Sequence, residues 1–325
     1  MLDFVAALGE GIYAIDTGFQ RPRFDAAYLL VEDGRAAFID TGTNHAVPRL
    51  LAALADLGLN PDSVDWVIPT HVHLDHAGGA GLLMQSLPRA RMLVHPRGLR
   101  HMVDPSMLYD GALAVYGAEE MQRSYGQLQP VPAERVQASS DGQILELAGR
   151  PLLLLDTPGH ARHHHCIWDA QSRGWFTGDT FGLSYREFDT AQGAWIIPTS
   201  TPVQFDPEAL RASIDRLMSQ APQCMYLTHY GRVGRDAGDV ERLARLLLEQ
   251  VDDMVALGLS LRHADERHER LKAGLQSLYL DRLRAHGSKL APERQLQLLQ
   301  MDVELNAQGL AVWLDRLDQA SSPSS

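Results

Sequence analysis

Four side chains that can bind metals lie within the six residues 71–76 (HVHLDH). Imidazole and carboxylate groups suit zinc, iron or manganese, and the segment contains no thiolate. It follows the apolar run 66–69, which is typical of a buried strand, and Gly78 and Gly79 come soon after it. A loop can turn several side chains toward one point, whereas a strand alternates them between two faces. We therefore predict a metal-binding loop at 71–76.

Three more metal-capable residues also follow short apolar runs. The runs 152–156, 175–177 and 225–227 are typical of buried strands, and each ends shortly before a histidine or an aspartate. Side chains at the ends of neighbouring strands meet at one edge of a sheet, so they can converge on the predicted loop. The residues concerned are His160, Asp179 and His229.

This set of motifs resembles that of the metallo-β-lactamase-fold hydrolase superfamily, over about residues 11–231. The resemblance implies an α/β fold, an αββα sandwich of two mixed β-sheets flanked by helices. It also implies a site for two divalent metal ions, with zinc as the first expectation and iron or manganese as alternatives. On this resemblance, the first metal is held by His71, His73 and His160, the second by Asp75, His76 and His229, and Asp179 bridges both.

The resemblance extends to residues behind the ligands. Asp40, in the segment 38–42 (FIDTG), matches the family's Asp-x-Gly at a strand end, where the aspartate supports the ligand loop without binding a metal. His164 falls where many family members have a second histidine, and it either supports the site or faces solvent. Five other histidines lack partner ligands in the sequence and are expected at the surface: His95, His101, His263, His268 and His286.

The implied metal site has a defined chemistry. Two adjacent metal ions lower the pKa of a bridging water, so that a hydroxide can attack a carbonyl or phosphoryl centre near neutral pH. Asp75 can orient this nucleophile or accept its proton. The leaving group needs a separate proton donor, for which Tyr185 and Tyr230 are the candidates. The alternative for both is a core tyrosine whose hydroxyl is hydrogen-bonded.

The composition favours a small acyl substrate. The chain has 29 Lys and Arg against 41 Asp and Glu, a net charge of −12, which disfavours nucleic acid and other polyanions as partners. Residues 181–185 and the Met- and Tyr-containing segment 97–136 supply apolar contacts. We predict hydrolysis of a lactone, carboxylic ester or thioester, as in the lactonase and glyoxalase II-like branches. A di-iron redox protein, a phosphodiesterase and a non-catalytic ligand-binding protein on the same fold stay open as alternatives.

The chain divides by composition into a body and an extension. We predict a catalytic domain at 1–235, with a helical insertion at 97–136 near the site. Residues 236–319 show only helical spacing of apolar residues, including one stripe from Pro292 to Leu317 that predicts a single long helix. We expect this extension to pack on the body or to mediate a homodimer. Residues 320–325 are expected to be disordered.

Cysteine usage and hydropathy predict the compartment. Cys166 and Cys224 lie among apolar residues and are expected to be buried thiols rather than a disulfide. No run of about 18 apolar residues predicts a membrane span. The first residues lack the basic region of a secretory signal. We therefore expect a cytoplasmic protein that does not bind membranes.

Overall fold

The first of two central β-sheets is built from the N-terminal part of the chain. Strands β1 to β4 pair in antiparallel fashion, and β4 to β7 pair in parallel. The computed structural model describes residues 1–200 and 203–321. In spatial order the strands are β1 (Val5–Gly9), β2 (Ile12–Asp16), β3 (Ala26–Glu32), β4 (Arg35–Ile39), β5 (Val64–Ile68), β6 (Arg91–Val94) and β7 (Val136–Ala138).

The second sheet packs face to face against the first. Its strands β11 and β12 are parallel, and its other neighbouring pairs are antiparallel. Both sheets are therefore mixed. In spatial order the strands are β13 (Gly231–Val233), β12 (Cys224–Leu227), β11 (Gly174–Gly178), β10 (His165–Asp169), β9 (Arg150–Asp156) and β8 (Ile144–Leu147).

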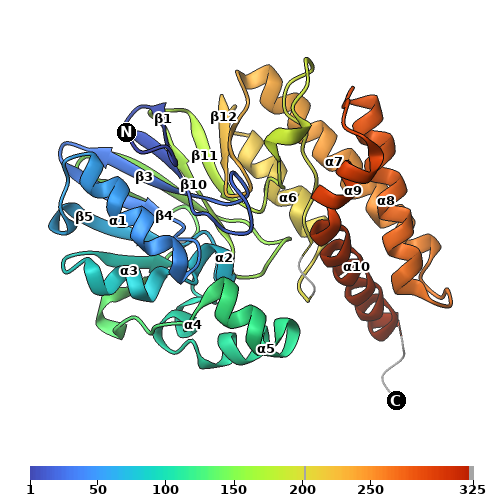
Figure 1. Ribbon diagram of the computed structural model, residues 1–325, viewed down its shortest axis with the longest axis horizontal. Helices are drawn as coiled ribbons and strands as arrows, with labels where there is room; N and C mark the ends of the chain where they lie inside the picture. Colours follow the sequence, from blue (N-terminus) through green and yellow to red (C-terminus); the bar gives the residue numbers. More distant parts are fainter. Residues whose placement is uncertain (201–202, 322–325) are drawn as a thin grey trace.

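Helices cover the outer faces of both sheets, which confirms the predicted αββα sandwich. The outer face of the first sheet carries α1 (Val47–Asp56) and α3 (Ala80–Ser86), and that of the second carries α6 (Pro207–Met218) and α7 (Ala237–Ser260) (Figure 1). Asp206 caps α6 because its carboxylate accepts a hydrogen bond from Ala209 N at 3.1 Å. The remaining helices are α2 (Leu74–Ala77), α4 (Leu99–Val103), α5 (Ser106–Glu120), α8 (Arg267–Ala285), α9 (Pro292–Leu298) and α10 (Gln300–Ser321).

The segment 97–136 is mostly helical, as the sequence predicts. It forms α4, α5 and a π-helical turn at Met121–Tyr125. In Figure 1 these helices lie below the two sheets, on the same side as α2. Leu108 and Leu113 of α5 pack against the large apolar cluster that also contains Tyr125.

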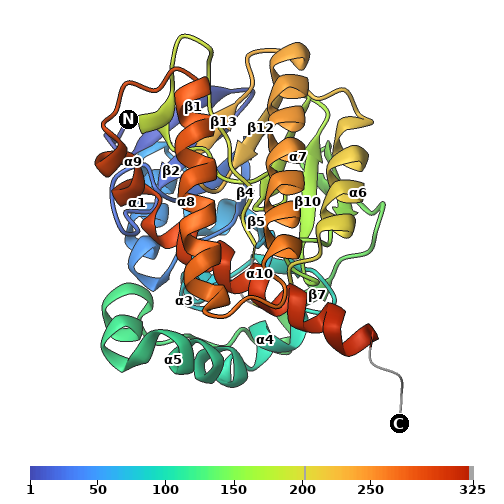
Figure 2. The ribbon, with the colours of Figure 1, turned by 90° about the vertical axis from the view of Figure 1, so that its right-hand side faces the viewer.

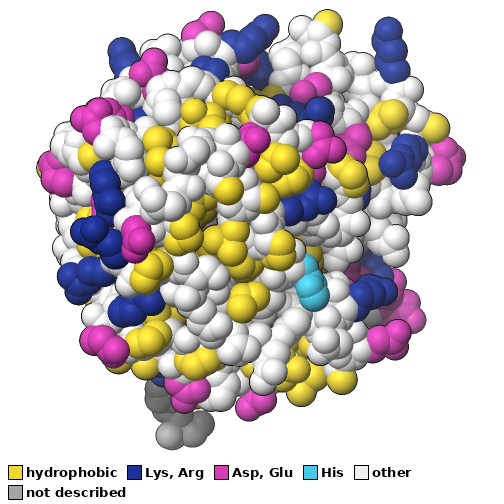
Figure 3. All heavy atoms as spheres, turned by 60° about the vertical axis from the view of Figure 1, so that its left-hand side comes forward, with side chains coloured by type: hydrophobic (Ala, Val, Ile, Leu, Met, Phe, Trp, Pro, Cys, Tyr) yellow, Lys and Arg dark blue, Asp and Glu magenta, His cyan; other side chains and the backbone are white. Residues whose placement is uncertain are grey.

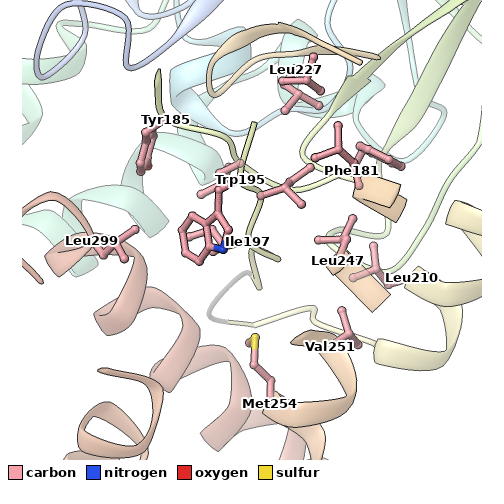
Figure 4. Packing of buried hydrophobic residues seen from close by; sticks show 14 of the residues in the cluster. Phe181, Tyr185, Trp195, Ile197, Leu210, Leu227, Leu247, Val251, Met254 and Leu299 are labelled. Atoms are coloured by element: carbon pink, nitrogen blue, oxygen red, sulfur yellow. The ribbon is translucent and has the colours of Figure 1, made fainter. Parts of the chain in front are cut away.

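Three apolar clusters hold the layers together. Between the sheets, Tyr28 packs edge to face against Phe176 and Tyr226, which stack on each other, with ring centroids 4.6 to 5.7 Å apart. A second cluster joins the first sheet to α1 and α3. The third joins the second sheet to α6, α7 and the C-terminal helices. Figure 4 shows part of this third cluster, which contains Trp195 and Ile197 together with Leu247, Val251 and Met254 of α7. Cys166 and Cys224 are buried free thiols, as predicted.

The C-terminal helices form a layer of their own beyond α6 and α7. Figure 2 shows α7 and α8 running side by side, with α10 crossing beneath them. The long helix predicted from Pro292 is instead two helices, because the chain turns at the fully buried Leu299 between α9 and α10. Helix α10 continues through Ser321, which differs from the disorder predicted for 320–325, and residues 322–325 lie outside the described part of the chain.

The surface carries charges of both signs. On the face shown in Figure 3, Lys and Arg side chains lie beside Asp and Glu, with apolar side chains between them. The excess of acidic residues is therefore not gathered into one patch on this face. None of the described helices combines the length and apolar character needed to cross a lipid bilayer.

Candidate metal centre

The predicted ligands meet at one edge of the sandwich, where β5, β9, β11 and β12 end. They form two clusters of side chains whose ligand atoms lie within 4.8 Å of one another inside each cluster. His71 and His73 belong to the loop after β5, and His73 is also the residue that precedes α2. The first cluster is His71, His73, His160 and Asp179, and the second cluster is Asp75, His76 and His229.

In the first cluster three imidazoles point their ring nitrogens at one another. His73 Nδ1 lies 2.7 Å from His71 Nε2 and 3.3 Å from His160 Nε2. His71 and His160 are fully buried, whereas His73 is half-buried. The cluster therefore presents two Nε2 atoms and one Nδ1 atom toward a common point.

Asp179 connects the two clusters through its two carboxylate oxygens. Its Oδ2 lies 3.3 Å from His160 Nε2. Its Oδ1 lies 3.4 Å from His76 Nε2 and 3.8 Å from His229 Nε2. Asp75 completes the second cluster, with Oδ2 at 3.4 Å from His229 Nε2. A carboxylate whose oxygens face two separate groups of imidazoles has the arrangement of a bridging ligand in a two-metal site.

Unpaired buried atoms show that the clusters fit metal ions. Among the described residues, His76 Nε2 and Asp179 Oδ1 are buried polar atoms with no hydrogen-bond partner. A buried polar atom left unpaired costs about 1–3 kcal/mol, so native structures satisfy nearly all of them. Both atoms are good ligands for a divalent ion, and the imidazole and carboxylate donors around them suit zinc, iron or manganese.

Hydrogen bonds behind the clusters fix the tautomer of three histidines. His160 Nδ1 donates to Thr199 O at 3.1 Å, and His229 Nδ1 donates to Phe24 O at 3.0 Å. His76 Nδ1 faces a carboxylate oxygen at 2.9 Å. Because each Nδ1–H is held by an acceptor, Nε2 is the ring nitrogen that is left to bind a metal.

Asp40 supports the ligand loop from its position at the end of β4. It accepts hydrogen bonds from Thr70 N at 2.7 Å, from His76 Nδ1 at 2.9 Å and from Thr228 Oγ1 at 2.7 Å. Its φ of 56° lies in the left-handed region, which Asp tolerates better than most residues. Through these contacts Asp40 holds the ligand loop in place, as expected from the sequence.

His164 and Gly178 place Asp179. His164 is fully buried, and its Nε2 accepts a hydrogen bond from Asp179 N at 3.2 Å. Gly178 has a φ of +47°, and a Cβ there would lie 2.5 Å from Thr70 Oγ1 and 2.6 Å from His164 Nε2. Only glycine lets the chain pass between these groups. Of the two expectations for His164, support of the site is therefore correct and exposure to solvent is wrong.

Charge interactions separate the protonation states of the ligands. Burial, together with neighbouring imidazoles, holds the pKa values of His71 and His73 well below the ordinary value. Burial alone would raise the pKa of Asp179, yet His76 and His160 lower it well below its usual range. Burial would lower the pKa of His229, yet Asp179 and Asp75 raise it to about 9. The metal-free site thus keeps Asp179 ionised and His71 and His73 neutral, whereas His229 is protonated near neutral pH and has to lose that proton when a metal binds.

The two candidate proton donors lie in different surroundings. Tyr185 is buried, and its hydroxyl donates to Asp302 Oδ1 at 3.0 Å. Burial and the nearby Asp302 raise the pKa of Tyr185 well above its ordinary value. Tyr230 is half-buried and packs against the cluster between the sheets. The geometry of Tyr185 matches the alternative of a core tyrosine with a hydrogen-bonded hydroxyl.

Two histidines expected at the surface are buried. His95 is 6% exposed and its Nε2 lies 3.0 Å from Asp156 Oδ1. His286 is also 6% exposed, with Nε2 at 3.1 Å from Gly193 O. Each has a polar partner that is distant in the sequence, so no local pattern indicates that the residue is buried. His263 is exposed as expected, whereas His101 and His268 are half-buried.

Two buried carboxyl groups near the site are absent from the sequence-based prediction. Asp25 is fully buried, Thr17 Oγ1 donates to it at 2.7 Å, and burial raises its pKa to about 7 against the opposing effect of His229. Burial likewise raises the pKa of Asp302, on α10, to about 6. The available signal is an acidic residue directly beside an apolar run, at Asp25 before β3 and at Asp302 within the apolar stripe of α10.

Comparison with known proteins identifies the class that this fold and ligand set define. A family model described as the metallo-beta-lactamase superfamily matches residues 21–229, so the protein belongs to that superfamily. Most members of the superfamily are hydrolases.

Individual relatives cover different parts of the chain. The metallo-beta-lactamase fold-containing protein ST1585 of Sulfurisphaera tokodaii is 25% identical over 254 residues, which are 77% of this chain and 89% of that protein. A hydroxyacylglutathione hydrolase of Synechococcus sp. is 30% identical over 155 residues, 47% of each chain. The crystal structure of metallo-beta-lactamase family protein TTHA1429 from Thermus thermophilus has a TM-score of 0.67 at 22% identity, and it covers 97% of this chain and 96% of its own. That last likeness concerns the fold alone, and its coverage includes the C-terminal helices.

Proposed function

We propose that the protein is a dinuclear metal-dependent hydrolase that cleaves a small ester-like bond in a lactone, a carboxylic ester or a thioester. The observation that carries the proposal is the position of Asp179, whose Oδ2 lies 3.3 Å from His160 Nε2 and whose Oδ1 lies 3.4 Å from His76 Nε2. One carboxylate thereby serves both clusters. Two divalent ions held by the clusters would supply Lewis acidity and a water activated at neutral pH.

The surrounding residues divide the remaining work. Asp75 is 26% exposed, which makes it the most accessible carboxylate of the site. It is placed to accept a proton from the attacking water and to keep that water oriented. Asp40 and Thr199 hold His76 and His160 through their Nδ1 atoms, so these rings do not turn during the reaction.

Apolar surroundings favour an acyl substrate over a polyanion. Phe24 packs its ring against His229 with centroids 5.3 Å apart. Exposed apolar side chains occur on three segments: Met107 on α5, Val203 shortly after Thr199, whose carbonyl holds His160, and Met301 on α10. The net charge of −12 adds repulsion toward polyanionic substrates. One relative is named as a hydroxyacylglutathione hydrolase, and a hydroxyacylglutathione is an acyl thioester, which supports the same class here.

The test combines metal analysis with a substrate panel. The purified full chain is reconstituted with Zn²⁺, Mn²⁺ or Fe²⁺, its metal content is measured, and hydrolysis is followed for lactones, carboxylic esters, thioesters and phosphodiesters. We expect about two metal ions per chain and turnover of at least one acyl class. For a variant of Asp179, the matched control is Asp169→Asn, because Asp169 is also a buried aspartate but lies at the last residue of β10 and outside both clusters.

Two results would contradict the proposal. The first is a protein that binds no stoichiometric metal under any of these conditions. The second is efficient turnover of phosphodiesters with none of lactones, esters or thioesters, which would favour the phosphodiesterase alternative. Reduction of oxygen by the iron-loaded protein, without hydrolysis, would instead favour the redox alternative.

A further inference from the structure

Helix α10 carries a buried asparagine in the middle of an apolar stripe. Asn306 is 1% exposed and lies between Val303 and Leu310, which are both buried in the large core cluster. A buried amide costs free energy unless its hydrogen bonds are made. Its partners therefore show what the residue is for.

All of the polar side-chain atoms of Asn306 contact two regions of the chain. Asn306 Oδ1 accepts hydrogen bonds from Ser200 N at 2.7 Å and Ser200 Oγ at 3.1 Å. Asn306 Nδ2 donates to Pro198 O at 3.1 Å and to Tyr279 Oη at 2.8 Å. The side chain thus holds residues 198 and 200 on one side and helix α8 on the other.

The residue between those two anchor points holds a candidate metal ligand. Thr199 O accepts the hydrogen bond from His160 Nδ1 at 3.1 Å. This acceptor keeps the proton on Nδ1 and the lone pair on Nε2, the atom that faces His73 and Asp179. Because Pro198 and Ser200 are both fixed by Asn306, the direction of the Thr199 carbonyl is set by α10.

We infer that Asn306 is a positioning residue for His160, and that the C-terminal helices help to build the first cluster through it. The inference rests on the proposed function, because it assigns His160 to a metal. Asn306 touches neither metal ligands nor substrate in this arrangement. It acts through Thr199, and its loss should alter the first cluster while leaving the second cluster, which Asp40 and Phe24 support, unchanged.

The experiment measures zinc affinity in the full chain. Asn306→Leu keeps a side chain of similar size and removes every hydrogen bond that the side chain of residue 306 makes to residues 198 and 200. Asn306→Asp keeps an acceptor for Ser200 and loses only the donors. Leu310→Ala is the matched control, because it damages the packing of α10 one turn further along without touching residues 198–200. Zinc dissociation constants come from chelator competition, and circular dichroism verifies that each variant is folded.

We expect Asn306→Leu to weaken one of the two zinc-binding steps about 10- to 100-fold, the range typical for loss of a group behind a metal ligand. The other step should change less than about threefold. Asn306→Asp should lie between Asn306→Leu and the wild type, and Leu310→Ala should lower the midpoint of thermal unfolding with both zinc steps retained.

Each contrary result has a distinct meaning. If the wild type binds two zinc ions and Asn306→Leu binds both equally well, the inference is wrong and the proposed function stands. If Leu310→Ala weakens zinc binding as much as Asn306→Leu, the effect comes from general loosening of α10, which also overturns the inference. A wild-type chain that binds no divalent metal overturns both the inference and the proposed function.

Discussion

Replacing Asp40 by asparagine changes one atom at the point where most of the support for the ligand loop converges. Asp40 is 1% exposed, and its carboxylate accepts from Thr70 N, His76 Nδ1 and Thr228 Oγ1 at 2.7, 2.9 and 2.7 Å. Asparagine has the same shape but only one accepting atom. If its oxygen serves Thr70 N, its NH₂ group must face His76 and Thr228, which are both donors in the wild type.

The two displaced donors respond differently. The hydroxyl of Thr228 can rotate and accept from the new NH₂ group, so its cost is small. His76 can accept only if its proton moves from Nδ1 to Nε2, the atom that faces Asp179. The second cluster then loses a lone pair. We expect its zinc affinity to fall about 10- to 100-fold, which is about 1.4–2.8 kcal/mol, and the metal-free protein to lose about 1–3 kcal/mol of stability.

Chelator competition measures the zinc affinities, and denaturant unfolding of the metal-free protein measures stability. Asp169→Asn is the control, since Asp169 is also fully buried and binds Arg150 at 2.6 and 2.9 Å far from the ligands. This control should lose stability and keep both zinc steps. Wild-type zinc affinity in Asp40→Asn, or equal losses in the two variants, would refute the account of His76.

Three further expectations concern the bridging ligand, the metals and α10. Asp179→Ala should remove the group that faces both clusters, and therefore lower zinc content and hydrolysis together by orders of magnitude; full metal content with full turnover would make Asp179 structural only. Zinc at 100 times its dissociation constant should stabilise the fold by about 2.7 kcal/mol per site, which differential scanning calorimetry would register as a higher unfolding temperature than in chelator. Burial raises the pKa of Asp302 to about 6 in the metal-free protein, above its value of about 3.9 in an unfolded chain, so the wild type should lose stability as the pH rises from about 4 to 6. Relative to the wild type, the free energy of unfolding of Asp302→Asn should therefore rise by about 3 kcal/mol from about pH 4 to 6. A difference between the two proteins that does not change with pH would contradict this sign.

Regular apolar runs are enough to predict most of the strands. Besides the four runs that precede the metal-capable residues, the runs at 12–16, 91–94 and 144–147 are among those that predict strands, and these three coincide with β2, β6 and β8. Three strands are absent from the sequence-based prediction: β1, β7 and β13. Each lies at the edge of a sheet, and β7 and β13 have only three residues each. Edge strands are half exposed and short, so they lack the continuous apolar pattern of a central strand.

The convergence of the ligands can be predicted from the sequence, but their support cannot. The spacing of His71, His73 and His76 after an apolar run indicates a loop at a sheet edge, and the structure brings these residues together with His160 and His229. In contrast, the acceptors that hold the Nδ1 atoms of His160 and His229 are backbone carbonyls. Every residue type supplies a carbonyl, so no side-chain pattern marks those positions.

The apolar stripe of α10 contains one polar residue that predicts a contact inside the core. Its apolar residues lie at 299, 303, 310, 314 and 317. With position 306 added, every step in this series is three or four residues, as is typical of the buried face of a helix, and residue 306 is an asparagine. Leucine there would satisfy packing alone. An asparagine at a core position is tolerated only when its hydrogen bonds are made, so it predicts a polar partner inside the core. That partner is the segment 198–200, and through it α10 reaches a candidate metal ligand.

The same helix brings Asp302 to Tyr185, so its buried face performs two tasks: its apolar residues hold the helix in place, and its polar residues reach the surroundings of the site. The homodimer contact expected of the extension stays a prediction, whose measurement is light scattering of the purified chain.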